Sequence, residues 1–425
     1  MLDMDATIAV AIFLVTYALI MSEKLHRAVI SLAGAMLVIF LGVLTQEEAI
    51  RGIDFNTLAL MLGMMMIVII TRRSGVFEYI AIKAAKVAKG DPIRILVLIT
   101  TITAVLSAFL GSVTVVLLMV PVTISICDRL NITPLPFLLC EIIGSNIGGT
   151  ATPVGDPPNM LIYSATDLQF MDFVFNLTPL VFAVLAVTIA LIAVFYRRRL
   201  VVSEDDKAKV MQLDEMAAIK DWMILKKSLV VLALTICGFF LQQIIGLHTG
   251  TIALSGATLL MIISGEEPED VLLSVEWPTL FFFIGLFILV ESLVKVGVIG
   301  YLAEGSLALT HGDFALTAIL ILWMSGIFSA FVDNIPFVTA MIPLIKEITH
   351  LTGMPIDPLW WSLALGTCLG GNGTLIGASA NVVVAGVSEK HGVLISFMWY
   401  LKIAFPLMIL SLLMSTLYLY LRYLI

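Results

Sequence analysis

Two stretches of small and polar residues could bind a solute inside an otherwise apolar chain. They read GSNIGGTATPVGDPPN (144–159) and GTCLGGNGTLIGASAN (366–381), and their Gly, Thr and Asn residues match at a constant offset of 222, from Gly144 to Gly366. Glycine and proline interrupt a helix. The freed backbone groups, together with Asn, Thr and Ser side chains, can hold an ion or a small polar solute. We therefore predict one binding site built from both stretches.

The predicted substrate-binding residues are the small and polar residues of these two stretches and of two chain breaks near 111 and 333. They are Gly111, Ser112, Thr114, Ser145, Asn146, Gly148, Gly149, Thr150, Thr152, Asn159, Asn334, Gly370, Gly371, Asn372, Thr374, Ser379 and Asn381. The simpler interpretation is that small residues only allow helices to pack closely. Two matched copies with embedded Asn and Thr favour the binding site.

Four carboxylates lie within or beside apolar segments, and none is matched by an acid in the other copy: Glu141, Asp156, Glu291 and Asp333. Ionisable groups inside a membrane are costly and commonly line a path for substrate or protons. We predict that Asp333 and Asp156 handle the proton or coupling ion. For Glu141 and Glu291 the alternatives are a place near the membrane interface or an ion pair with a basic residue such as Lys295.

Other chemistry receives less support. Cys140 and Cys368 lie near the interruptions, and thiolates suit soft metals and metalloids. Cysteine is also among the residues most often buried, so we predict neither a metal site nor a cofactor. The sequence shows no Ser/His or metal-ligand constellation, and His311 and His350 are isolated. An enzyme is therefore not expected.

The composition identifies the class of protein that must hold these residues. The chain has 425 residues, of which 60% are hydrophobic and 13% are charged, against about 25% charged in soluble proteins. This predicts a polytopic membrane protein whose partner is the lipid bilayer. The net charge is −8 and no basic, aromatic patch is present, so no nucleic-acid partner is expected. The four cysteines lack CxxC spacing, which makes a disulfide framework unexpected.

The predicted fold is an all-α polytopic membrane protein made of two inverted-topology repeats. Apolar runs of about 20 residues predict five transmembrane helices per repeat, one of them broken. Each repeat also has a stretch too long for one crossing, with a break near its middle, which predicts a re-entrant hairpin. The boundaries are 1–196 for the first repeat, 197–227 for a cytoplasmic linker and 228–425 for the second repeat. Hairpins 93–128 and 314–348, with broken helices 135–165 and 359–387, form a predicted transport domain.

The distribution of basic residues predicts the orientation. Five crossings per repeat make the second copy enter from the opposite side. The basic clusters at 24–27, 72–94 and 197–227 are then all cytoplasmic, as the positive-inside rule requires. Both termini are predicted to be extracytoplasmic, in a cytoplasmic (inner) membrane. The acidic loop 264–270 also falls inside and is the one poor fit. Amphipathic segments 76–89 and 298–310 are expected to lie flat at the interface.

The doubled motif, with SAFVDNIPFVTAMIP around Asp333, resembles the ion transporter superfamily. The most similar branch is that of the arsenical pump membrane protein (ArsB) and the pink-eyed dilution protein, related to NhaD sodium/proton antiporters and divalent anion/sodium symporters. The resemblance implies a scaffold domain, a mobile transport domain with an elevator-like movement, and a homodimer. It places the site at the tips Gly111-Ser112 and Asp333-Asn334 and at the unwound stretches. A cytoplasmic ATPase subunit is a further possible partner.

The chain departs from the branch pattern at its first tip. Members of the branch commonly have Asp-Asn at both tips, and divalent anion symporters commonly have a sequence like Ser-Asn-Thr at both. In this chain the first tip reads Gly111-Ser112-Val113. This weakens both a dicarboxylate carrier and a cation antiporter with two tip carboxylates. The leading hypothesis is proton-coupled efflux of arsenite or antimonite. The alternatives are a Na⁺/H⁺ antiporter with oxygen ligands, and a carrier of an organic or inorganic anion held at half-helix N-termini.

Overall fold

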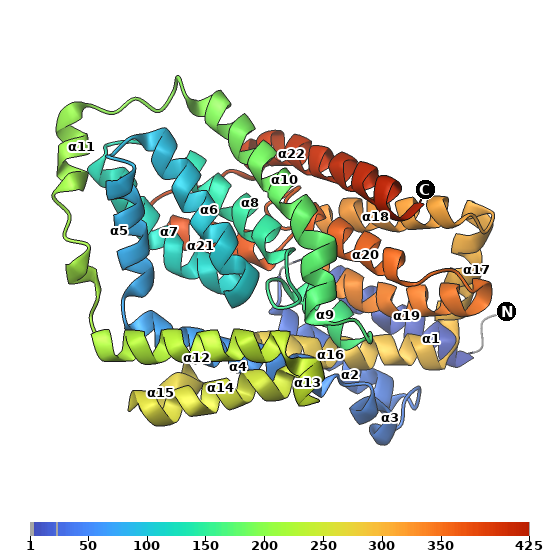
Figure 1. Ribbon diagram of the computed structural model, residues 1–425. Coiled ribbons are helices and arrows are strands. Elements are labelled where there is room, and N and C mark those ends of the chain that lie inside the picture. Colours follow the sequence, from blue (N-terminus) through green and yellow to red (C-terminus); the bar gives the residue numbers. More distant parts are fainter. Residues whose placement is uncertain (1–3, 23, 425) are drawn as a thin grey trace.

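The computed structural model describes residues 4–22 and 24–424, which form helices joined by loops and, within those residues, no strand (Figure 1). In this part of the chain nine helices are long and apolar enough to cross a membrane. They are α1 (Met4–Met21), α4 (Phe55–Arg73), α6 (Pro92–Leu110), α7 (Ser112–Arg129), α10 (Phe170–Tyr196), α12 (Trp222–Phe240), α16 (Trp277–Lys295), α18 (Phe314–Phe331) and α22 (Phe397–Leu419). The predicted all-α, multi-pass membrane fold is confirmed.

Each predicted hairpin is a pair of adjacent helices. α6 and α7 are joined by Gly111 alone, whose φ of 84° is a backbone conformation that favours glycine. α18 and α19 (Asn334–Thr352) are joined by Val332 and Asp333, and the Asp333 carboxylate caps α19 by accepting a hydrogen bond from the backbone N–H of Ile335. The two tips thus turn by different local means, glycine in one copy and an aspartate cap in the other.

Each glycine-rich stretch separates two short helices. In the first copy α8 (Leu135–Gly149) ends before residues 150–156, and α9 (Pro157–Ser164) follows them. In the second copy α20 (Asp357–Gly370) and α21 (Ser379–Lys390) are separated by residues 371–378. Pro157 and Pro158 fill the first two positions of α9, where a missing N–H costs nothing because it has no intrahelical partner. The prolines therefore start the second half-helix, whereas the first has already ended at Gly149.

The two copies repeat the same hydrogen bonds at the 222-residue offset. In each, a hairpin serine donates to a carbonyl of the half-helix that follows, a threonine of the unwound segment donates to a hairpin carbonyl, and an asparagine donates to that threonine's carbonyl. The pairs of bonds are Ser107–Ser145 and Ser329–Thr367, Thr152–Ala108 and Thr374–Ala330, and Asn159–Thr152 and Asn381–Thr374. This supports the interpretation of the chain as a structural repeat.

The copies also interlock. A Cβ on Gly63 of α4 would lie 2.5 Å from the carbonyl carbon of Ala253 in α14 (Thr249–Ser264), and one on Gly285 of α16 would lie 2.5 Å from that of Ser31 in α2 (Arg27–Phe40). The two contacts are equivalent by the same offset. Each copy therefore supplies a glycine that lets the other copy's helix approach its backbone closely.

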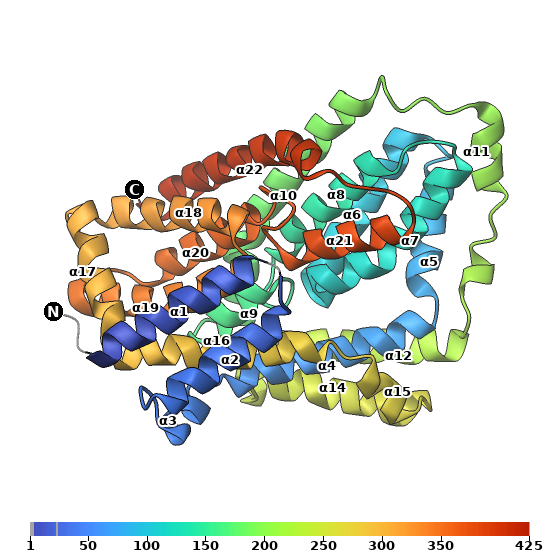
Figure 2. The same cartoon turned by 180° about the vertical axis from the view of Figure 1, so that it is seen from behind.

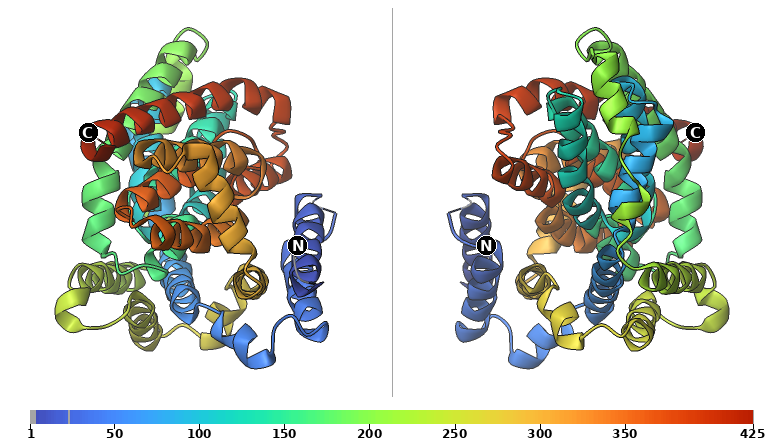
Figure 3. Two further views of the ribbon diagram at one scale, coloured as in Figure 1. Left: turned by 90° about the vertical axis from the view of Figure 1, so that its right-hand side faces the viewer. Right: turned by 90° about the vertical axis from the view of Figure 1, so that its left-hand side faces the viewer.

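The helices form layers that run across the view in Figures 1 and 2. A lower layer contains α1, α2, α4, α12, α14 and α16; the hairpins and half-helices lie above it, and α10 and α22 cover them. The end views of Figure 3 show α1 and α2, in dark blue, on the side opposite to α12 and α14, in yellow-green. The two hairpins extend inward from opposite ends of the molecule, and their tips lie near its middle (Figure 1).

Two helices cross the direction of the others at the two ends of the molecule: α5 (Val76–Val87) beside the linker, and α17 (Val298–Thr310) opposite to it (Figure 1). They coincide with the segments predicted to lie at the interfaces. α1 begins and α22 ends at the end opposite α11 (Glu204–Met211). These placements accord with inverted copies, while the orientation of the chain in a membrane stays a prediction.

Charged contacts gather at the linker end. Lys86 of α5 pairs with Glu215 of the linker, and its ammonium lowers the pKa of that carboxyl. Arg73 pairs with Glu266 of the acidic loop that fitted the orientation poorly, so part of that loop's charge is neutralised by a neighbouring cation. α12 already begins at Trp222, six residues before the predicted boundary at 228, because the Asp221 carboxylate caps its first turn.

Candidate functional site

An amide cluster joins the two copies where their broken helices meet. The side-chain nitrogen of Asn146 in α8 donates to the side-chain oxygens of Asn372, at 2.9 Å, and Asn381, at 2.8 Å. All three residues are at most 2% exposed. The predicted meeting of the two glycine-rich stretches is therefore seen in the structure as direct contact between their asparagines.

Two asparagines hold the unwound segments in shape. Asn159 donates to the carbonyls of Thr150 and Thr152, at 3.0 and 3.1 Å, and Asn381 donates to those of Gly371 and Thr374, at 2.7 and 2.9 Å. Buried carbonyls that leave a helix need such partners. The amide nitrogens of these asparagines are thus committed to the fold and are not free to bind a substrate.

Most of the other predicted binding residues are also engaged in the protein itself. The hydroxyls of Ser145 and Thr150 donate to carbonyls of their own helix. Gly148 and Gly370 give room for the backbones of α6 and α18, respectively. Of the residues predicted to bind substrate, four line the cavity between the hairpin tips and the lower layer: Gly111, Ser112, Thr114 and Ser379.

Both hairpin tips meet on Asp156. Its carboxylate oxygens accept from the Ser112 hydroxyl at 2.7 Å and from the Asn334 amide at 3.3 Å. Asp156 is 2% exposed. The backbone N–H of Ser112 also donates to the carbonyl of Gly155 at 3.0 Å. The first copy's break therefore positions the first residue of α7 and the first residue of α19 around one buried acid.

Asp333 has a basic partner that sequence reasoning missed. Nη1 of Arg27, the first residue of α2, lies 2.8 Å from Oδ2 of Asp333 and 2.7 Å from the Ser379 hydroxyl, which itself donates to the same carboxylate at 3.0 Å. The sequence placed Arg27 in a cytoplasmic basic cluster, and its counterpart at the 222 offset is Thr249. No periodicity or motif marks Arg27 as a site residue.

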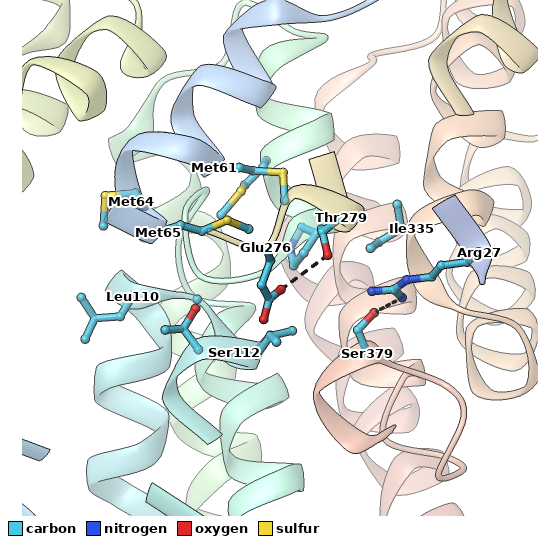
Figure 4. Close-up of a pocket in the computed structure, with 15 residues that line it drawn as sticks. Arg27, Met61, Met64, Met65, Leu110, Ser112, Glu276, Thr279, Ile335 and Ser379 are labelled. Carbon is cyan, nitrogen blue, oxygen red and sulfur yellow. Dashed lines mark hydrogen bonds between the residues drawn. The ribbon is translucent and has the colours of Figure 1, made fainter. Parts of the chain in front are cut away.

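A cavity of about 60 Å³ lies beside these groups (Figure 4). First-turn residues of four helices line it: Ser112 of α7, Pro157 of α9, Ile335 of α19 and Ser379 of α21. Helix N-termini carry partial positive charge, and Arg27 adds a full one. The lower layer contributes the methionines of α4, Met61, Met64 and Met65, together with Thr279 of α16 and Glu276, the residue before that helix.

Glu276 is the second charged group that the sequence did not indicate. Its carboxylate extends into the cavity below the start of α16 (Figure 4) and accepts from the Thr279 hydroxyl at 3.4 Å. Its counterpart at the 222 offset is Asp54, whose carboxylate instead caps α4 through the N–H groups of Asn56 and Thr57. The acid thus recurs in both copies, but only the second faces the cavity.

A larger cavity of about 380 Å³ adjoins the same ion pair. Its lining includes His26, Phe331 and Asp333, and it shares Arg27 and Ser379 with the smaller cavity. Arg27 therefore stands between a small central space and a larger one beside the loop that joins α1 to α2.

Two carboxylates lie away from these cavities. Glu141 is fully buried, and one of its oxygens accepts from the Thr123 hydroxyl at 2.5 Å while the other has no partner among the described residues. Glu291 packs next to Gly52 in the loop after α3 (Gln46–Arg51). Lys295, the suggested partner of these acids, pairs with Glu48 at 2.5 Å instead, so that suggestion is wrong.

The cysteines do not form a thiolate site. Cys368 is buried and its thiol lies 3.5 Å from the side-chain oxygen of Asn159, and Cys140 is buried in α8. Neither lines the two cavities described above. The described residues contain no group of three or more His, Cys, Asp or Glu side chains that could hold a metal ion.

Known proteins resemble this chain over most of its length. A family model described as citrate transporter (CitMHS) matches residues 17–366. An uncharacterized transporter of Mycobacterium tuberculosis is 44% identical, over 98% of this chain and 99% of that protein. The 46 kDa membrane protein of Mycobacterium leprae is 42% identical, over 99% of both chains. The human P protein is 34% identical over 96% of this chain, which spans 59% of the P protein's length.

The fold is also found in a solved structure. The YdaH transporter of Alcanivorax borkumensis aligns with a TM-score of 0.58 at 12% identity, covering 90% of this chain and 87% of that chain. The family model and the curated relatives confirm the superfamily resemblance predicted from the doubled motif, and the transporter class with it. The chain belongs to the CitMHS citrate transporter family and is a secondary transporter of the membrane.

Proposed function

We propose that this transporter carries a small carboxylate-bearing anion of the citrate class. The observation that carries the proposal is the convergence of the Arg27 guanidinium and the first turns of four helices on one cavity. Arginine binds a carboxylate through two parallel hydrogen bonds, and the helix N-termini add partial positive charge. The description of the family as citrate transporters supports the same class of substrate.

The sizes of the cavities indicate how such an anion would enter. A volume of about 60 Å³ corresponds to roughly two water molecules and does not hold a tricarboxylate. The adjoining cavity of about 380 Å³ lies in the range typical of small-molecule sites. We infer that the substrate arrives through the larger cavity and reaches the central space only after the site has opened, as an elevator-like movement of the hairpins would allow.

The buried acids are the proposed coupling groups. Asp156 and Asp333 would repel an anion unless a cation neutralised them. A proton or Na⁺ bound at either acid removes that repulsion, so cation and anion favour one another's binding. The oxygen and amide groups around Asp156 suit a proton or a hard cation alike.

Two other substrates remain alternatives. Na⁺/H⁺ exchange is favoured by the contact of both hairpin tips with Asp156. Arsenite or antimonite efflux was the leading hypothesis from sequence, on the basis of a neutral, hydroxyl-rich site. The cavity also contains one positive and one negative side chain, Arg27 and Glu276, that this hypothesis did not assume, and most of the hydroxyls are bonded within the protein.

Transport into proteoliposomes tests the proposal. Purified full-length protein is reconstituted, and uptake of labelled citrate is measured under a proton gradient, a sodium gradient and neither. We expect citrate uptake driven by one of the two gradients. Sodium-driven proton movement without citrate uptake would establish the antiporter, and arsenite uptake in its place would establish the metalloid carrier. The inner membrane, extracytoplasmic termini, homodimer and ATPase subunit are proposals that need separate tests.

A further inference from the structure

Arg27 joins the lower layer to the second hairpin and the second broken helix. It is the first residue of α2, which packs against α16 in the lower layer, and its guanidinium lies 5.1 Å from the ring centre of Phe282 in that helix. Asp333 and Ser379, its two hydrogen-bond partners, belong to the second hairpin and the second broken helix. A further polar link across the same boundary runs from the Tyr17 hydroxyl to the carbonyl of Pro336, at 2.6 Å.

The same guanidinium lines both cavities. The small central cavity and the larger outer one share Arg27 and Ser379, and Asp333 lines only the larger one. About a third of the Arg27 side chain is exposed, so a solute in the larger cavity can reach it. A carboxylate arriving there competes with Asp333 for the same planar set of donors.

We propose that Arg27 acts as a latch between the two cavities. In the empty transporter its ion pair with Asp333 keeps the passage closed, and an anion that binds the guanidinium in place of Asp333 opens it. The inference rests on the proposed function, because it assumes an anionic substrate. Asp333 acts in it as a competitor of the substrate for Arg27. Removal of Asp333's charge should therefore tighten anion binding, whereas removal of Arg27's charge should weaken it. An ion pair with a purely structural role gives no such opposite signs.

The chain offers a closely matched control. Arg73 and Glu266 form an ion pair whose side chains are 32% and 16% exposed, against 32% and 15% for Arg27 and Asp333. Neither member of the control pair lines the two cavities. Arg73→Gln and Glu266→Gln therefore remove a similar interaction without touching the proposed latch.

Isothermal titration of citrate into purified, full-length protein measures the effect. We expect Arg27→Gln to raise the Kd at least tenfold, Arg27→Lys to raise it less, and Asp333→Asn to lower it about three- to tenfold. The two control variants should stay within about twofold of the wild-type Kd. If Asp333→Asn weakens binding as Arg27→Gln does, the latch is refuted while the proposed function stands. Absence of binding to the wild-type protein by any carboxylate refutes the proposed function, and the latch with it.

Access to the central cavity gives a second measurement, which does not depend on affinity. Thr114 lines the central cavity, so Thr114→Cys in a Cys237→Ala background reports on access through its reaction with a membrane-impermeant methanethiosulfonate. In the protein that keeps Arg27, we expect citrate to speed this labelling. In the protein that also carries Arg27→Gln, we expect fast labelling with or without citrate. Labelling that is equally slow in all variants would show that Arg27 does not close the passage.

Discussion

Asn146 provides the most direct test of the contact between the two copies. Its side-chain nitrogen is the donor for the side-chain oxygens of Asn372 and Asn381. Asn146→Ala removes this donor and leaves two buried acceptors without it. A buried polar group that loses its partner costs about 1–3 kcal/mol, so the two together would cost about 2–6 kcal/mol.

We expect the lower half of that range, about 2–4 kcal/mol. Removal of the carboxamide leaves a space that can hold a water molecule, in a polar setting where water can bridge the two acceptors. Ser145→Ala is the matched control. Ser145 is equally buried and adjacent in α8, but its hydroxyl donates to the carbonyl of Ile142 in its own helix. Removal of that bond should cost less than about 1 kcal/mol.

The assay is reversible unfolding of the purified protein in mixed micelles with increasing SDS, followed by circular dichroism. We expect Asn146→Ala to lower the free energy of unfolding by about 2–4 kcal/mol and Ser145→Ala to change it little. Equal losses in the two variants would show that the amide cluster does not hold the copies together. Full stability in both would refute the burial argument itself.

Three further outcomes follow from the contacts. Gly370→Ala should prevent correct folding, measured as loss of the monodisperse peak, because its Cβ would lie 2.6 Å from a backbone Cα of α18; Gly386→Ala, with no atom within 4 Å, should be tolerated. Cys140 is buried in α8 and lines neither cavity, which predicts that Cys140→Ala leaves transport within about twofold; abolished transport would support a role for its thiol. Hydrogen bonds from the lysine of α16 and from Thr45 lower the pKa of Glu48 to about 2, below its unfolded value of about 4.3. Its contribution is therefore present above about pH 4.3 and lost as the pH falls toward 2, so the difference in melting temperature between wild type and Glu48→Gln should shrink over that interval.

The sequence by itself determined the membrane class and the order of the elements. The long apolar runs, the glycine and proline breaks and the amphipathic segments are local properties, and helices in lipid must satisfy their own backbone. Consequently the hairpins turn where the sequence predicted, at Gly111 and Asp333, and the helices are interrupted after Gly149 and Gly370 as predicted. The helix Val298–Thr310, which runs across the direction of the others, also coincides with a predicted segment. The doubled motif also identified the superfamily.

The tertiary structure decided which of the polar residues face the cavity between the hairpin tips and the lower layer. Asn159, Asn381 and Ser145 were predicted to bind a substrate, yet their donors satisfy carbonyls of the protein. Arg27 was predicted to belong to a cytoplasmic basic cluster, yet it reaches a carboxylate 306 positions away. A hydrogen bond depends on the direction and distance of its partner. For residues this far apart in the chain, the packing of the helices sets the direction and the distance of the partner. A single sequence does not reveal that packing.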